Sequence, residues 1–260
     1  HVHGNTLIEV AWTLAPAVVL VMIAVPTITT IWEVDRPTTD PDALVVEVVG
    51  HQWWWEFRYP EFDVVTANEL HIPVGRTVDF RLTSADVIHS FWIPQLAGKR
   101  DLVPGRENNL WFSADSVGTF IGQCAEFCGL SHALMKLEVV VEDADEFDAW
   151  IGRQAVPAAA MDPEDPLAAL AARGSEVLLR AGCIACHRID GTVAQGVLGP
   201  DLSHVGSRQK IAAGILDNTP ENMERWLRDP ALVKPGALMP SLDLTDEDIR
   251  SLTAYLSSLR

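Results

Sequence analysis

The sequence is short of positive charge. Its 260 residues include 19 Lys and Arg against 36 Asp and Glu, which gives a formal net charge of −17. Because nucleic-acid binding depends on basic side chains that face phosphates, this balance argues against a nucleic-acid partner. It leaves a basic protein partner open, although an acidic surface also simply keeps a protein in solution.

Cysteine is scarce as well. The four cysteines fall into two close pairs, Cys124/Cys128 and Cys183/Cys186, so none is left for a structural disulfide if each pair holds a cofactor. The chain also lacks a charged start followed by a short apolar core, which argues against a signal peptide. Because the first residue is His1, we expect a chain that is processed or whose beginning is missing.

One long stretch has no charge at all. Val10–Trp32 is 23 residues long and rich in Val, Ile, Leu and Ala. That length spans a bilayer core as a helix, and Pro16 and Pro26 are tolerated in membrane helices. Trp12 and Trp32 lie where an aromatic belt is expected. We predict a transmembrane helix, with a buried helix of a soluble protein as the alternative.

Glu9 stands at the start of this apolar run, directly before Val10. An ionisable group at membrane depth is costly and is a candidate for a functional site. The alternative is a solvated carboxylate at headgroup depth, and the residues alone favour neither.

From Asp42 to about Val141 the pattern changes to short β-branched runs. Turn residues such as Pro73–Gly75 and Pro104-Gly105 separate them, a spacing that predicts an all-β sandwich or barrel. The expected strands are Leu44–Val49, Val64–Thr66, Thr77–Leu82, Asn109–Phe112 and Lys136–Val141.

Two cysteines, a histidine and a methionine fall within Gln123–Met135. Together with His89, which we expect to end a strand, they form a soft ligand set that suits copper. Two cysteines four apart could bridge a pair of copper ions, which suits an electron relay. Zinc and a disulfide are the alternatives, but zinc has little use for a thioether, and a disulfide leaves His132 and Met135 unexplained. Ligands from a strand end and a late loop resemble the Greek-key copper fold, the cupredoxin.

The C-terminal third is helical in pattern. An acidic helix is expected at Glu142–Trp150, a Pro- and Ala-rich linker follows over 151–166, and further helices are expected at Leu170–Ala181, Pro220–Arg228 and Asp246–Leu259. Cys183-Ile184-Ala185-Cys186-His187 is the attachment motif of c-type haem, in which the histidine is an axial ligand. A thioredoxin-like Cys-x-x-Cys would need a βαβ setting, which the pattern does not offer.

The second axial ligand is predicted to be Met239, in a Pro- and Gly-containing loop beyond the haem motif. A thioether raises the iron potential, which suits electron transfer. Met223 competes, but it lies on a helical stretch, where methionine usually packs in the core. His204 would give a haem of lower potential.

These motifs together resemble one family. The loop Cys124–Met135 with His89 resembles the CuA centre of cytochrome c oxidase subunit II, as do the stretches Gly50–Trp55 and Gly98–Arg106. The apolar segment, with Asn5–Pro16, resembles the second transmembrane helix of that subunit. The C-terminal part resembles the cytochrome c fused to subunit II in caa-type oxidases, so the resemblance covers the whole chain.

The resemblance implies a multidomain membrane protein with a transmembrane α-helix, an all-β cupredoxin-like Greek-key sandwich and an all-α class I cytochrome c domain. The implied ranges are 1–36 for the helix, 37–150 for the sandwich, 151–166 for the linker and 167–260 for the cytochrome. The family usually has two transmembrane helices, and the first is expected to be cleaved, missing or carried elsewhere. The visible helix then places both cofactor domains outside the bacterial cytoplasmic membrane.

The resemblance also assigns roles to residues. Trp53 matches the tryptophan through which electrons reach the copper, and Glu9 matches a carboxylate at the mouth of a proton pathway. Trp54 stands where the family usually has tyrosine. The carboxylate of Glu126 would reach a magnesium site shared with subunit I. The implied copper ligands are His89, Cys124, Glu126 (through its carbonyl), Cys128, His132 and Met135, and the implied haem c ligands are Cys183, Cys186, His187 and Met239.

The implied function is that of the electron-input subunit of a terminal haem-copper oxidase. Electrons would pass from haem c to the copper pair and on to haem in subunit I, where O2 is reduced to water and protons are pumped. The expected partners are subunits I and III, an upstream cytochrome c or reductase complex, and the lipid bilayer. Nitrous oxide reductase would need a propeller domain, a copper-delivery protein rarely combines such a site with covalent haem, and a quinol oxidase subunit lacks these copper ligands.

Overall fold

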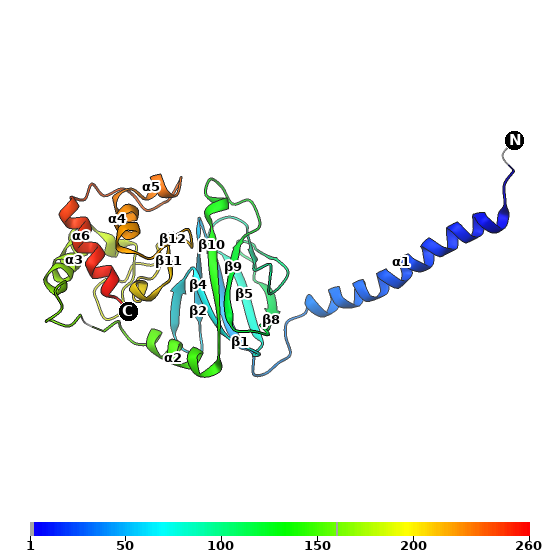
Figure 1. Cartoon of the computed structure of the whole chain (residues 1–260), viewed down its shortest axis with the longest axis horizontal. Helices are drawn as coiled ribbons and strands as arrows, with labels where there is room; N and C mark the ends of the chain where they lie inside the picture. Colours follow the sequence, from blue (N-terminus) through cyan, green and yellow to red (C-terminus); the bar gives the residue numbers. More distant parts are fainter. Residues whose placement is uncertain (1–2, 160) are drawn as a thin grey trace. The chain divides into compact units, whose positions relative to one another are not determined.

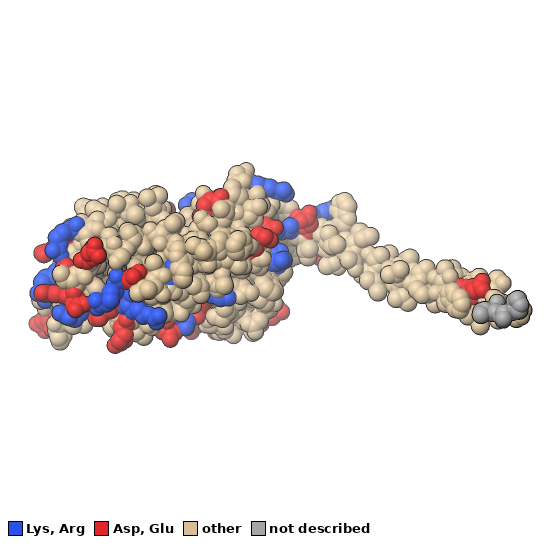
Figure 2. Space-filling model, turned by 90° about the horizontal axis from the view of Figure 1, so that it is seen from above, with Lys and Arg blue, Asp and Glu red and all other residues tan. Residues whose placement is uncertain are grey.

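The charge-free run forms one long helix, α1 (Thr6–Val34). The side chain of Asn5 caps it by accepting hydrogen bonds from first-turn backbone amides. The helix is apolar enough to cross a membrane, with a mean hydropathy of 2.2 over its best window, and none of its residues is buried. Charged side chains are almost absent along it (Figure 2). A helix that is apolar all round needs an apolar environment, and a bilayer supplies one.

The computed structural model describes residues 3–159 and 161–260 (Figure 1). The predicted ranges 1–36 and 151–166 therefore include positions, 1, 2 and 160, that lie outside the described residues. The chain divides into a helical unit that ends at Thr39 and a second unit, Asp40–Arg260.

The second unit begins with a sandwich of two five-stranded sheets, in the orders β3-β2-β1-β5-β8 and β4-β10-β9-β6-β7. Most neighbouring strands are antiparallel, but β1 pairs with β5 and β4 with β10 in parallel, as expected when the chain crosses between the sheets. Alternate residues of β1 are fully buried and face a core of aromatic and aliphatic side chains. The strands are β1 (Leu44–His51), β2 (Trp54–Tyr59), β3 (Val64–Ala67), β4 (Glu69–Pro73), β5 (Val78–Ser84), β6 (His89–Trp92), β7 (Arg100–Leu102), β8 (Asn108–Phe112), β9 (Gly118–Cys124) and β10 (Lys136–Glu142).

All five expected strands are confirmed, with boundaries that shift by one or two residues. The prediction that His89 ends a strand is wrong, because His89 opens β6. The reason lies in the preceding turn: β5 stops at Ser84, whose hydroxyl donates to the carbonyl of Val87, and the backbone amide of Val87 donates to Asp86. These local hydrogen bonds end one strand and start the next.

The sandwich is followed by a helical domain. Its helices are α2 (Ala144–Gln154), α3 (Ala168–Arg180), α4 (Pro220–Arg228), α5 (Pro230–Val233) and α6 (Asp246–Ser258). Helix α2 packs back on the sandwich through Trp150, whose ring lies 5.5 Å from that of Tyr59. Because α2 runs to Gln154, positions 151–154 of the predicted linker are helical. A small hairpin of β11 (Lys210–Ile211) and β12 (Leu216–Asp217) was not predicted.

The helical domain is held by the crossing of α3 and α6 (Figure 1). A Cβ on Gly174 would lie 2.0 Å from the carbonyl oxygen of Ser251, so only glycine permits this approach. Helix α6 begins with a capping box between Thr245 and Asp248. The expected helices at Leu170–Ala181 and Asp246–Leu259 are thus confirmed to within two residues.

A buried polar cluster joins the sandwich to the helical domain. His71 stacks on Trp150 at 4.0 Å, and its two ring nitrogens lie 3.0 Å from carboxylate oxygens of Glu142 and Glu69. Burial lowers the pKa of His71, but the bonds to the two carboxylates outweigh burial and raise the pKa above its usual value. The other oxygen of Glu69 accepts a hydrogen bond from the backbone N–H of Gln209 at 2.9 Å, so the cluster spans both domains.

Candidate metal and haem centres

The first candidate site is the loop between β9 and β10, which brings two sulfurs together. The Sγ atoms of Cys124 and Cys128 lie 3.7 Å apart, and both side chains are buried. The ends of the loop are joined by the backbone N–H of Cys124, which donates to the carbonyl of Met135 at 3.0 Å. A sulfur separation of 3.7 Å is far from the roughly 2 Å of a disulfide, and both cysteines are free. The disulfide alternative therefore does not fit this geometry.

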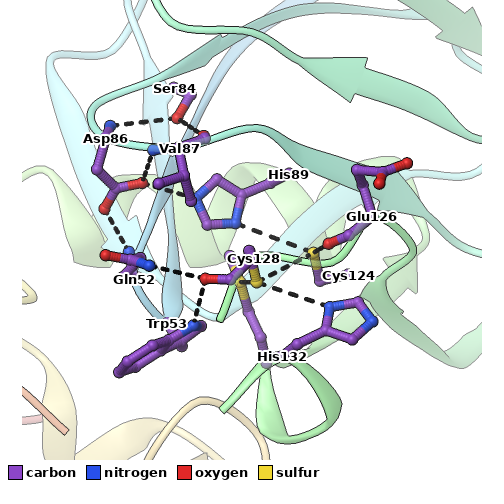
Figure 3. A network of polar contacts seen from close by, with 11 residues as sticks. Gln52, Trp53, Ser84, Asp86, Val87, His89, Cys124, Glu126, Cys128 and His132 are labelled. Atoms are coloured by element: carbon purple, nitrogen blue, oxygen red, sulfur yellow. Dashed lines mark hydrogen bonds and ion pairs between the residues drawn. The ribbon is translucent and has the colours of Figure 1, made fainter. Parts of the chain in front are cut away.

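Three other predicted ligands, His89, Glu126 and His132, lie around the sulfur pair (Figure 3). The Nδ1 of His89 lies 3.9 Å from the sulfur of Cys124, and the Nδ1 of His132 lies 3.6 Å from the sulfur of Cys128. The carbonyl oxygen of Glu126 is 3.2 Å from the sulfur of Cys124. The carboxylate of Glu126 points away from the sulfurs in the same view.

Met135 completes this donor set. Its Sδ lies 3.9 Å from the Sγ of Cys128, and its side chain is fully buried. The structure thus brings together all six residues that the sequence singled out as copper ligands. The ligand atoms of His89, Cys124 and Cys128 lie within 4.8 Å of one another, a spacing that could hold a metal ion.

The chemistry of the donors fits copper. A hydrogen bond from Cys128, together with one from His89, lowers the pKa of the Cys124 thiol to about 3. The resulting thiolate raises the pKa of the Cys128 thiol, because two negative sulfurs this close repel one another. Both can ionise only if positive charge lies between them. Two thiolates, two imidazoles and a thioether favour soft copper over hard cations, and the thioether argues against zinc.

His89 is oriented by a partner that sequence reasoning missed. Its Nε2 lies 2.8 Å from a carboxylate oxygen of Asp86, whose other oxygen accepts a hydrogen bond from the backbone N–H of Gln52. A carboxylate on the far nitrogen of a ligating histidine fixes the tautomer and directs the other nitrogen to the metal. The signal was the aspartate three positions before His89. Gly50 is required here, since a Cβ would lie 2.8 Å from the ring of His89.

Trp53 contacts the copper loop directly. Its indole Nε1–H donates to the carbonyl of Cys128 at 2.9 Å, and the amide of Gln52 donates to the same oxygen at 2.7 Å. Trp53 is only 8% exposed. The indole is therefore fixed against a cysteine of the site, and the role in electron entry that the resemblance implies for Trp53 stays a prediction.

The second candidate site is the Cys183–His187 motif. The Nδ1–H of His187 donates to the carbonyl of Pro200 at 2.7 Å, which leaves Nε2 to bind a metal. Burial lowers the pKa of His187, so the imidazole stays neutral, as a ligand must. Both cysteines are free and half-buried.

The surroundings of this motif fit a haem. Apolar side chains that would normally pack inside are 72–75% exposed at Val193, Val197, Leu198 and Leu238. These residues lie on the segments next to the haem motif and next to Met239. A large apolar group such as a porphyrin, packed among them, would cover their exposed side chains.

The three candidates for the second axial ligand occupy different settings. Met239 is half-buried at the edge of the helical core. Met223 is 3% exposed and packs inside that core. His204 is buried and its Nε2 bonds the carbonyl of Val156 at 2.9 Å. Met239 is therefore the one of the three that is neither fixed in the core nor bonded to the linker.

Glu9 lies in the first turn of α1, where its backbone N–H donates to the carbonyl of Asn5. Its carbonyl accepts from the hydroxyl of Thr13 at 2.8 Å. The side chain is exposed at the end of the apolar helix. This placement is compatible with both readings of Glu9 from the sequence.

Three family models match the chain. "Cytochrome C oxidase subunit II, transmembrane domain" matches residues 1–30, and "Cytochrome C oxidase subunit II, periplasmic domain" matches residues 64–143. "Cytochrome c" matches residues 171–260. The three matches follow the order helix, sandwich and helical domain seen in the structure.

Relatives match the chain over its whole length. Cytochrome c oxidase subunit 2 of Alkalihalophilus pseudofirmus is 42% identical over 264 residues, which cover 100% of this chain and 75% of the relative. The same subunit of a Bacillus species is 38% identical and covers 100% of this chain and 76% of the relative. Among solved structures, the periplasmic domain of subunit II of cytochrome oxidase of Bradyrhizobium japonicum is 32% identical, with a TM-score of 0.43, over 45% of this chain and 96% of that chain.

Proposed function

The chain belongs to the cytochrome c oxidase subunit 2 family, and from this premise we propose how its residues deliver electrons. It is the electron-input subunit of a terminal oxidase and carries its own cytochrome c domain. It is anchored in the bacterial cell membrane with its soluble domains on the outer side. Reduction of O2 takes place in partner subunit I.

The observation that carries the proposal is the paired sulfurs of Cys124 and Cys128, 3.7 Å apart and surrounded by two imidazoles and a thioether. This soft donor set suits copper, and two sulfurs this close could hold a pair of copper ions between them. When bound, the copper pair and haem c supply one-electron transfer. The family implies copper and haem c; the count of two copper ions is our proposal.

The protein's own residues position these groups. Cys183 and Cys186 would bond the haem, and the hydrogen bond from His187 to the carbonyl of Pro200 leaves the other ring nitrogen free to bind the iron. Met239 would bind the other face. At the copper site Asp86 orients His89, and the side chains of Gln52 and Trp53 hold the carbonyl of Cys128. A rigid site of this kind lowers the reorganisation that accompanies each electron.

Having both centres on one chain makes delivery between them intramolecular. Effective concentration then replaces a diffusional encounter. An outside donor, a cytochrome c or a reductase complex, must still reload the haem. We propose subunits I and III as the membrane partners, and a magnesium site shared with subunit I that takes the exposed carboxylate of Glu126.

The proposal is tested by metal and haem analysis of the purified membrane complex. We expect two copper ions and one covalently bound haem c for each copy of this chain, beyond the copper of subunit I, and a near-infrared band from the mixed-valence pair. Zinc in place of copper, or a single copper for each chain, would contradict the proposal.

Glu9 gives a separate prediction about protons. If its carboxylate delivers protons to subunit I, Glu9→Ala should slow proton-coupled turnover several-fold and leave reduction of the copper pair at the wild-type rate, because only the proton path is altered. Turnover and copper reduction are measured on the same membrane preparation. Glu33→Ala, at the opposite end of α1, is the matched control and should change neither rate. Unchanged turnover in Glu9→Ala would assign Glu9 to the headgroup region.

A further inference from the structure

Lys234 is the most unusual charged residue of the second unit. It lies in the helical domain, after α5 and before Met239, and is 4% exposed. Long cationic side chains are rarely buried unless they are paired. In the described part of the chain, residues 3–159 and 161–260, no ion pair involves Lys234, so its burial must rest on other contacts.

The ammonium of Lys234 bridges the two domains. Its Nζ donates to the carbonyl of Trp53 at 2.5 Å, in the sandwich, and lies 3.4 Å from the carbonyl of Ala212, in its own domain. The same residue of the sandwich, Trp53, donates its indole N–H to Cys128. Lys234 is thus linked to Cys128 of the copper site through Trp53, by one hydrogen bond on each side of that residue.

The residues that follow Lys234 extend this contact between the two domains. The hydroxyl of Ser131, on the copper loop, donates to the carbonyl of Pro235 at 2.5 Å. Gly236 adopts a φ of +81°, and a Cβ there would lie 3.1 Å from both the indole of Trp53 and the side chain of Leu130. The backbone at 234–236 therefore lies directly against Trp53, three residues before Met239.

We infer that Lys234 is a positioning residue that docks the cytochrome domain on the copper loop and so sets the route from haem to copper through Trp53. The inference rests on the proposed function, because it assumes that the two sites hold haem and copper. It adds a residue, outside both ligand sets, that determines their relative placement. A buried polar group costs free energy when its hydrogen-bond partners are lost, so the docked arrangement is the one in which Lys234 has partners.

Two other interdomain hydrogen bonds report whether the domains are docked. The backbone N–H of Lys136, in the sandwich, donates to the carbonyl of Ala213 at 3.1 Å. The backbone N–H of Gln209 donates to Glu69. Both amides lose their acceptors when the domains separate, whereas the β9–β10 ladder around Val139 stays within the sandwich. Amide hydrogen exchange can therefore separate undocking from unfolding.

The test compares Lys234→Met with Arg173→Met in the full-length membrane complex. Both variants replace a long cationic side chain of the cytochrome domain by an apolar one, but Arg173 is exposed and pairs with Glu247 on its own domain. For Lys234→Met we expect exchange of the peptides that contain Lys136 and Gln209 to rise about tenfold or more, since the two buried carbonyls lose their donor. Arg173→Met and the ladder peptides should behave as wild type.

Electron transfer gives the second measurement. After photoreduction of the haem, transfer to copper in Lys234→Met should slow several-fold, while the haem spectrum, the near-infrared band and both midpoint potentials stay at wild-type values. If the haem spectrum and the near-infrared band are both retained, the proposed function holds at any rate of transfer from haem to copper. A loss of either signature in the wild-type chain would instead count against the proposed function.

A glycine variant tests the same contact without touching the lysine. Gly236→Ala should separate the loop from Trp53 and give the same rise in exchange and fall in rate. Gly75→Ala, at a φ of +75° with no atom within 4 Å of the added Cβ, is the control for backbone strain alone. Wild-type exchange and wild-type transfer in both Lys234→Met and Gly236→Ala would overturn the inference.

Discussion

Replacing Cys124 by serine is expected to abolish the near-infrared band of the copper pair and to stop electron delivery to the partner subunit, while the haem c bands remain. Cys124 supplies one of two sulfurs that lie 3.7 Å apart and also faces His89 and the carbonyl of Glu126. A serine hydroxyl is a hard donor that cannot replace a bridging thiolate. The expected loss is complete because Cys128 is the only other cysteine of this domain, and one sulfur cannot replace the pair.

A variant of the haem motif shows whether the effect of Cys124→Ser is confined to the copper site. Cys183→Ser should disrupt covalent haem attachment and leave the near-infrared band in place, since its thiol belongs to the other domain. Absorption spectra and copper content of both variants check the pair of predictions. Two copper ions and an unchanged band in Cys124→Ser would show that the sulfurs of the loop do not hold the metals.

The second large effect is expected at Met239. Met239→Leu keeps the volume and removes the sulfur, so the haem should lose the signature of a thioether ligand and its midpoint potential should fall on the order of 0.1 V or more. Electron transfer from the haem to the copper pair should change with it, because the driving force changes. Redox titration of the haem c band measures the effect.

Met223→Leu is the matched control. Met223 is 3% exposed in the helical core, where leucine is a volume-conserving replacement, so its haem spectrum and potential should stay at wild-type values. An unaltered spectrum and potential in Met239→Leu would mean that another residue binds the iron.

The fold was predictable where the pattern is local. The apolar run, the β-branched strands and the helices can each be recognised from one continuous stretch of sequence. Helix α4, for example, was predicted with the bounds that it has, Pro220–Arg228. Strands were missed where the pattern is broken. Strand β2 contains Glu56 and Arg58, which pair with each other, and β9 begins at a glycine and has no buried position before Gly122. Charged residues in a strand are stabilised by cross-strand and tertiary neighbours, which a sequence pattern does not reveal.

The ligand residues of the candidate copper site could be predicted from the sequence, but the residues that hold those ligands in place could not. Ligand types and spacing single out Cys124, Cys128, His132 and Met135, and the structure brings them together. The turn that makes His89 open a strand depends on hydrogen bonds of Ser84 and Asp86, which periodicity does not contain. Lys234 contacts Trp53 across 181 positions of sequence, and no local pattern identifies such a pair.

If electrons reach the copper through Trp53, as proposed, its 8% exposure bears on the choice of donor. The loop at 234–236 lies over the indole, so an outside carrier would have to deliver its electron to the chain's own cytochrome domain rather than to Trp53. The donor could then be changed by altering the surface of that domain alone, while the residues of the copper site stay as they are.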